Sequence, residues 1–173
     1  DPQIAWFLSR FVIDVRSVSL DPVLMRQDWL SAYDFTTKRG AVFLGDYARA
    51  ADPFGHVGER TVSIQVTSVV RASDRSFQVK WIETAYDRGA LAGTTHWTAI
   101  LTVEVRSPAN AEALRKNPLG LYVDAVDWSR ELEPPAAASQ AVRPPVPPPA
   151  NVPSGSPLDP NLASSSPAPE TQP

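Results

Sequence analysis

Hydrophobic residues at the start of the chain recur with helical spacing. They lie three or four positions apart, so a helix would gather them on one side. This stripe consists of Ile4, Phe7, Leu8, Phe11, Val12 and Val15. The pattern predicts an amphipathic helix whose apolar side packs on the rest of a domain.

Two more helices are predicted before residue 53. Asp21 followed by Pro22 predicts the start of the second, because Asp is a good N-cap and Pro fits the first turn. The third is predicted over about 40–51 and ends at Asp52-Pro53. Their apolar faces are Met25, Trp29 and Tyr33 on the second helix, and Phe43 and Tyr47 on the third.

After Gly58 the hydrophobic pattern has a period of two, which is typical of strands. Three strands are predicted first, and a last one from Leu121 to Ser129 follows a short helical run at 111–116. The residues expected on the inner faces of the first three are Val62, Ile64 and Val66; Phe77, Val79 and Trp81; and Trp97, Ala99, Leu101, Val103 and Val105. Asp87-Arg88-Gly89 predicts a hairpin loop, and Gly93 predicts a bulge or bend.

Helices first and an antiparallel meander second indicate an α+β fold. N-terminal helices packed on a curved four-stranded antiparallel sheet would bury both periodic faces. Four of the five tryptophans fall on apolar faces and are expected in the core, and Trp6 is the exception.

An Asn-Pro-Leu-Gly sequence separates the short helical run from the last strand. Pro118 biases Asn117 away from the helical region, and Gly120 can adopt the positive φ of a sharp turn. We therefore interpret Asn117, Pro118, Leu119 and Gly120 as a structural turn motif that sets the entry angle of the last strand.

Five blocks of sequence place this turn in a wider pattern. They are Ile4-Ala5-Trp6, Ser19-Leu20-Asp21-Pro22, Ala32-Tyr33-Asp34-Phe35-Thr36-Thr37, Trp97-Thr98-Ala99-Ile100-Leu101 and Arg115-Lys116-Asn117-Pro118-Leu119-Gly120. In this order they resemble TrbF-type conjugal transfer proteins, over roughly residues 1–132. These proteins are inner-membrane assembly factors of type IV secretion systems. The resemblance implies a cystatin-like cone of the nuclear-transport-factor type, which agrees with the helices and strands predicted above.

The resemblance also implies a location and a role. The family carries one membrane helix followed by a periplasmic domain, so we expect a periplasmic domain of a bacterial inner-membrane protein. The sequence holds no run of about 18 apolar residues and no signal peptide, so taken alone it is typical of a soluble protein. The resemblance instead implies a transmembrane helix that precedes Asp1. The implied function is non-enzymatic: self-association as a homo-oligomer, and contacts with other type IV secretion subunits.

Composition divides the 173 residues into two parts. Residues 134–173 hold 13 of the 18 prolines and only three charged residues, so we expect a disordered or polyproline-like tail after an assembly-factor domain at 1–133. Residues 143–149 include a PxxP spacing that a polyproline-binding partner could recognise, although a semi-rigid spacer is the favoured interpretation. A soluble adaptor that works through this tail is a third functional hypothesis.

Charge and cysteine content exclude several classes of protein. The net charge is −3 and no basic stripe is present, so direct nucleic-acid binding is not expected. The chain lacks cysteine, which excludes a disulfide framework and a thiolate metal site. His56 and His96 do not have the spacing of metal ligands, and no phosphate-binding glycine motif occurs, so neither a metal nor a cofactor is predicted.

The alternative function is a small-molecule-binding protein or an isomerase- or dehydratase-like enzyme of the same cone fold. Four aspartates could supply its acid–base chemistry, namely Asp46, Asp52, Asp124 and Asp127. The alternative interpretation is that these aspartates are surface and helix-capping residues without a chemical role. An enzyme predicts an open pocket with an aspartate or histidine inside it, whereas an assembly factor predicts a pocket filled by Phe, Trp and Leu side chains.

A second candidate site lies on the first helix, opposite its main stripe. Trp6 and Ile13 are seven residues apart there, with Arg10 between them. A helix packed through one face would hold Trp6 and Ile13 out to solvent, which is typical of an interface for self-association or partner contact. Two alternatives are open: Trp6 at the headgroup level of a membrane, or another part of the domain covering this side.

Overall fold

The structure is a computed structural model that describes residues 2–132. The elements in chain order are α1 (Pro2–Arg16), α2 (Pro22–Asp34), α3 (Lys38–Ala51), β1 (Arg60–Arg71), β2 (Ser76–Asp87), β3 (Ala90–Val105), α4 (Ala111–Lys116) and β4 (Leu121–Arg130). The predicted order of helices and strands is therefore confirmed. The proline-rich segment 134–173 lies outside the described residues.

Side-chain caps fix the starts of the second and third helices. Asp21 accepts hydrogen bonds from the backbone N–H groups of Val23 and Leu24, as its N-cap assignment predicts. Thr37 caps α3 by accepting a hydrogen bond from the N–H of Gly40 at 3.2 Å. Because Thr37 supplies this cap, α3 begins two residues earlier than the sequence pattern indicated.

The four strands form one antiparallel sheet in the order β1-β2-β3-β4. The hairpin between β2 and β3 turns at Arg88 and Gly89, both with positive φ, as predicted. The register between these strands shifts where Ala85 faces Gly93 and Tyr86 faces Leu91, which confirms the bulge beside Gly93. The sheet is therefore an open antiparallel meander, and the bulge beside Gly93 bends it.

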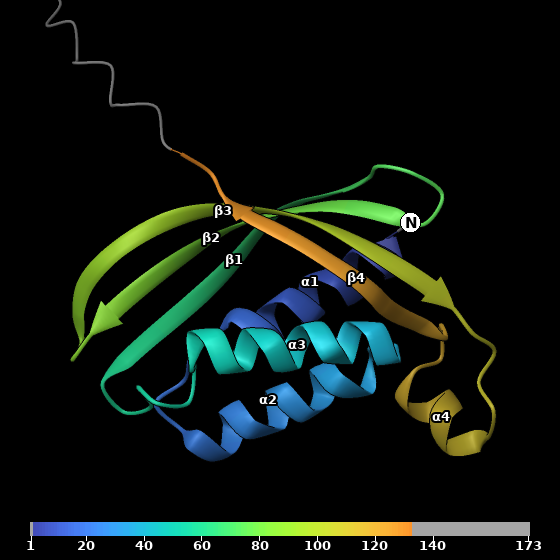
Figure 1. The fold of residues 1–173 in the computed structure, drawn as a ribbon, viewed down its shortest axis with the longest axis horizontal. Coiled ribbons are helices and arrows are strands. Elements are labelled where there is room, and N and C mark those ends of the chain that lie inside the picture. Colours follow the sequence, from blue (N-terminus) through green and yellow to red (C-terminus); the bar gives the residue numbers. More distant parts are fainter. Residues whose placement is uncertain (1, 133–173) are drawn as a thin grey trace, which may run out of the picture. The chain divides into compact units, whose positions relative to one another are not determined.

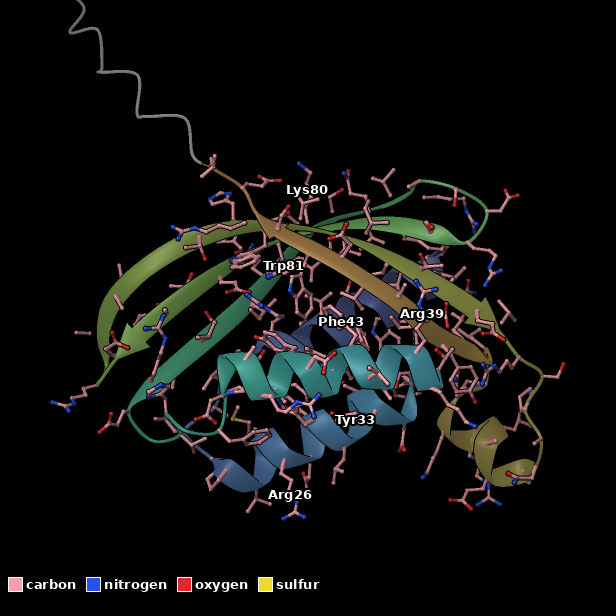
Figure 2. The ribbon with its side chains drawn as sticks, in the orientation of Figure 1. Arg26, Tyr33, Arg39, Phe43, Lys80 and Trp81 are labelled. Carbon is pink, nitrogen blue, oxygen red and sulfur yellow. The ribbon has the colours of Figure 1, made fainter. Side chains whose placement is uncertain are left out.

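α1, α2 and α3 all lie on one face of the sheet, and α2 is the farthest from it (Figure 1). Figure 2 shows Trp81 of β2 and Phe43 of α3 between the sheet and the helices, and Lys80 on the opposite face of the sheet. The core fills this layer, and its largest fully buried apolar side chains are Trp81, Phe11, Leu8, Met25, Leu44, Leu101, Val12, Val15, Val79 and Val123. Val105, predicted on the inner face, is exposed, because it is the last residue of β3 at the rim of the sheet.

Candidate functional site: the turn before the last strand and its surroundings

Asn117 holds the turn closed from the inside. It ends α4 as the C-cap, and its side chain is buried. The side-chain amide donates to the carbonyl oxygen of Leu121 at 2.7 Å and accepts from the N–H of Leu121 at 3.1 Å. Its backbone carbonyl also accepts from the N–H of Gly120 at 3.0 Å. One asparagine therefore satisfies both backbone groups of the first residue of β4, much as a neighbouring strand would.

Gly120 is required at its position for two reasons. Its φ of +59° lies in the left-handed region, where a β-branched residue is strained. A Cβ atom there would also collide with the carbonyl oxygen of Arg106, while the N–H of Arg106 donates to the carbonyl oxygen of Gly120 at 2.8 Å. The glycine thus lets the turn lie directly against the segment that leaves β3.

The other side of β4 pairs with the connection between α2 and α3. The N–H of Val123 donates to the carbonyl oxygen of Phe35, and the N–H of Thr37 donates to that of Val123. A Cβ on Gly40 would collide with the Val123 carbonyl, so glycine is what allows α3 to approach β4 this closely. The start of β4 is therefore held by β3, by the turn and by the helical layer together.

Asp124 takes part in the same junction. It is the extra residue of the bulge between β3 and β4, and it accepts a hydrogen bond from Thr37 Oγ1 at 2.7 Å. An Arg39 nitrogen lies 3.4 Å from its other carboxylate oxygen. Asp124, a candidate acid–base residue by sequence, thus ties α3 to β4 as a structural partner.

The structure brings the two sequence candidates together. The turn and the first turn of α1 border one apolar concavity of about 480 Å³, lined by Pro2, Gln3, Trp6, Pro118 and Leu119. Trp6 is 69% exposed, and Leu119 is exposed beside it. Neither the helical stripe of α1 nor the turn motif alone predicted this common surface. We call the five residues the Trp6 surface.

Ile13 was expected to be exposed to solvent on the same side of α1 as Trp6, and this expectation is wrong. Ile13 is half-buried, and Arg10 forms ion pairs with Asp14 at 2.9 Å and with Asp28 of α2 at 3.6 Å. α2 therefore covers the second half of this side of α1, which was one of the two alternatives. On this side of α1, Trp6 and Arg10 are exposed and Ile13 is half-buried.

Asp14 is a buried carboxylate that the sequence analysis did not single out. Only 1% of the residue is exposed, and Arg10 is its ion-pair partner. Burial raises the pKa of Asp14 from 3.8 to about 6; the Arg10 charge opposes this rise, and the charge of Asp28 adds to it. The folded domain thus binds this proton more tightly than the unfolded chain does.

This difference in pKa predicts a pH-dependent stability. Between about pH 4 and pH 6 the folded state holds more protons, so the free energy of unfolding should fall as pH rises through that window and stay low above it. Asp14→Asn should remove this dependence and raise stability at pH 7.5 by about 1–3 kcal/mol. Urea unfolding at pH 4.5 and 7.5 measures both effects. Asp46→Asn on the exposed surface of α3 serves as the control, and an unchanged pH profile in Asp14→Asn would contradict the assignment.

The layer between the sheet and the three helices, called the cone below, contains a buried arginine among aromatic rings. Arg16, at the end of α1, forms an ion pair with Glu83 of β2 at 2.7 Å and donates a hydrogen bond to the hydroxyl of Tyr47 at 3.1 Å. Its guanidinium carbon lies within 6 Å of four ring centroids, those of Tyr47, Trp81, Trp97 and Trp128. Burial raises the pKa of Tyr47, and the Arg16 charge opposes that rise. The aromatic filling was predicted, but the arginine and glutamate were not.

A sequence signal for both charged residues was present. Arg16 continues the series Ile4, Leu8 and Val12 at steps of four, and Glu83 continues the alternation of Phe77, Val79 and Trp81. Periodicity alone therefore places them on inner faces. Neither residue was predicted to be buried, because charged residues are almost never fully buried unless they are paired.

The other candidate groups lie on loops and outer surfaces. Asp46 pairs with Arg49 on α3, Asp52 is the exposed C-cap of α3, and Asp127 is exposed on β4. His56 is exposed before β1, and His96 is half-buried on β3. Within residues 2–132, no group of three or more His, Asp or Glu side chains is arranged to hold a metal ion.

Comparison with known families identifies this domain. The VirB8 protein family matches the chain over residues 1–131. The chain belongs to the VirB8 family.

A curated relative narrows this VirB8-family assignment. The chain is 33% identical over 128 residues to the conjugal transfer protein TrbF of Rhizobium radiobacter, which covers 72% of the chain. The chain spans 58% of the length of that relative. The TrbF resemblance seen in the sequence is thereby confirmed.

Solved structures of VirB8-type domains share the fold. TrwG of Bartonella birtlesii superposes with a TM-score of 0.68 at 15% identity, over 78% of this chain and 95% of that one. VirB8 of Agrobacterium tumefaciens superposes with a TM-score of 0.67 at 15% identity, over 76% and 93%. The α+β fold class, with helices on a four-stranded antiparallel sheet of the nuclear-transport-factor type, is confirmed. Among residues 2–132, no helix is long and apolar enough to span a bilayer.

Proposed function

We propose that this VirB8-family domain is a non-enzymatic assembly unit of a conjugative type IV secretion system. It acts in the periplasm by binding a second copy of itself and other subunits of the machine. A membrane helix preceding the domain anchors it in the inner membrane. The family match over residues 1–131 and the 33% identity to TrbF support this proposal.

The observation that carries the proposal is the exposure of the Trp6 surface. A tryptophan that is 69% exposed, with exposed Leu119 beside it, is a typical centre of an interface. The turn beneath it is held by Asn117 and Gly120, so Pro118 and Leu119 are presented on a fixed backbone. Little side-chain or loop ordering is then needed when a partner binds.

The enzyme alternative receives less support. It requires an open cone with an aspartate or histidine inside, and the cone instead holds the Arg16–Glu83 pair among four aromatic rings. Asp124, the most buried of the four candidate aspartates, already binds Thr37. The arrangement favours a domain that works through its outer surface.

Sedimentation equilibrium of the purified chain tests self-association. Wild-type protein should show a concentration-dependent mass, and Trp6→Ala combined with Leu119→Ser should sediment as a monomer over the same range. Val42→Ser, a change at another exposed apolar side chain on α3, is the matched control and should behave as wild type. Equal mass distributions for wild type and the double variant would exclude the Trp6 surface from self-association.

We further propose that residues 134–173 form a spacer that does not dock on the domain. Deleting them should leave the thermal midpoint within about 5 °C of wild type, because a proline-rich chain with few apolar anchors buries little surface. Differential scanning calorimetry of the two chains measures this. A larger fall in midpoint would indicate a docked tail.

A further inference from the structure

The cone contains a complete binding environment for a cation. Four rings surround the Arg16 guanidinium, whose carbon lies 4.3 Å from the ring centroid of Trp97, 4.9 Å from that of Trp128, 5.3 Å from that of Tyr47 and 5.9 Å from that of Trp81. Aromatic faces within about 6 Å attract a cation, most strongly where water is excluded. The Arg16 side chain is only 8% exposed, so this condition is met.

Polar groups complete the aromatic box that the rings of Tyr47, Trp81, Trp97 and Trp128 form. Glu83 supplies the counter-charge, and its Oε1 atom lies 2.7 Å from Nε of Arg16. Trp81 donates its indole N–H to the same oxygen at 2.8 Å, so the carboxylate is held in place by the box itself. The hydroxyl of Tyr47 accepts a second hydrogen bond from Arg16 at 3.1 Å.

The box and its occupant come from different parts of the chain. Tyr47 belongs to α3, Trp81 and Glu83 to β2, Trp97 to β3 and Trp128 to β4. Ring contacts also join the walls without Arg16: Trp81 stacks on Trp97 at 6.2 Å, and Tyr47 packs edge-on against Trp128 at 5.0 Å. The walls are therefore assembled by the packing of α3 on the sheet, and α1 contributes only the cation.

From this separation we infer that the cone of the domain is a binding site for guanidinium-type cations, which the chain fills with its own Arg16. The site is selective for planar, delocalised cations. A guanidinium stacks flat on indole rings and donates several hydrogen bonds in one plane, whereas an ammonium is a compact, strongly hydrated ion. An Arg16→Ala variant should accordingly bind free guanidinium, methylguanidinium or a similar small cation in place of the missing side chain.

Titration of Arg16→Ala with guanidinium chloride between 0 and 50 mM tests the inference, well below denaturing concentrations. Tryptophan fluorescence should change saturably, and the thermal midpoint should rise by at least about 4 °C. Urea, a neutral molecule of similar shape, and sodium chloride at equal ionic strength should produce neither effect. Wild-type protein, whose site is occupied, should not respond to guanidinium in this range. A response that is linear, or equal in wild type and variant, would overturn the inference.

Two further variants keep the test decisive. Arg16→Ala with Glu83→Gln retains the rings but loses the counter-charge, so its affinity for guanidinium should fall at least about tenfold. If Arg16→Ala is unfolded without ligand, circular dichroism should show guanidinium-dependent folding, because a ligand that binds only the folded state shifts the equilibrium toward it. The inference would also be overturned if guanidinium does not refold an unfolded Arg16→Ala variant although the Arg16→Lys variant folds without any ligand.

Discussion

Gly120→Val should destabilise the domain strongly. Valine at this position combines a strained positive φ with a collision between its Cβ and the Arg106 carbonyl. Relief of that collision would separate the turn from the end of β3 and break the hydrogen bond from Arg106 to Gly120. We expect a loss of about 3–5 kcal/mol in the free energy of unfolding, a large part of the stability of an ordinary domain. Urea unfolding followed by circular dichroism measures it.

Pro118→Ala is the matched control for this prediction. Pro118 is exposed, and alanine can take the same backbone angles, so the loss should stay below about 1 kcal/mol. If Gly120→Val unfolds at the wild-type urea midpoint, the turn is not the constrained element described above. Its residues would then matter only through the Trp6 surface.

Glu83→Leu should destabilise the domain more than the removal of both charges does. The single change leaves the Arg16 guanidinium buried without a counter-ion and the indole N–H of Trp81 without its acceptor. Breaking a buried pair in this way costs about 3–5 kcal/mol. Arg16→Met combined with Glu83→Leu removes both charges and keeps much of the volume, so it should recover more than half of the loss.

A double-mutant cycle by chemical denaturation measures this coupling. The cycle comprises wild type, Glu83→Leu, Arg16→Met and Arg16→Met with Glu83→Leu. The exposed pair Arg60–Asp87 is a suitable reference, because its removal should change stability by less than about 1 kcal/mol. Additive losses in the Arg16–Glu83 cycle would show that the two charges do not depend on each other.

The sequence predicts elements well where one local signal decides them. The spacing of three and four residues in α1, the Asp21 N-cap and the alternation of Phe77, Val79 and Trp81 each depend on neighbours in the chain, and each is confirmed. The left-handed Gly120 follows equally from its own turn. Such features need no knowledge of the tertiary arrangement.

Features that join distant segments could not be derived in the same way. Ile13 is half-buried because α2 crosses that part of α1, and the crossing depends on how both helices pack on the sheet. The meeting of Trp6 with Leu119 likewise joins positions more than a hundred residues apart. Arg16 shows a different failure: its position in the helical pattern was informative, but the sequence analysis followed that pattern only through its apolar residues.

The way β4 closes the domain has a consequence for the order of folding. The hydrogen-bond acceptor of Thr37 is Asp124, which lies 87 positions later in the chain. The rings of Phe43 and Tyr47 likewise pack against the ring of Trp128 in β4. Contacts between such distant residues form late, because a long loop must first be closed. During synthesis the helices and the first three strands therefore precede the segment that covers their aromatic side chains. A ribosome-bound chain that ends before Leu121 should bind a hydrophobic dye strongly, and one that extends past Arg130 and has cleared the exit tunnel should not.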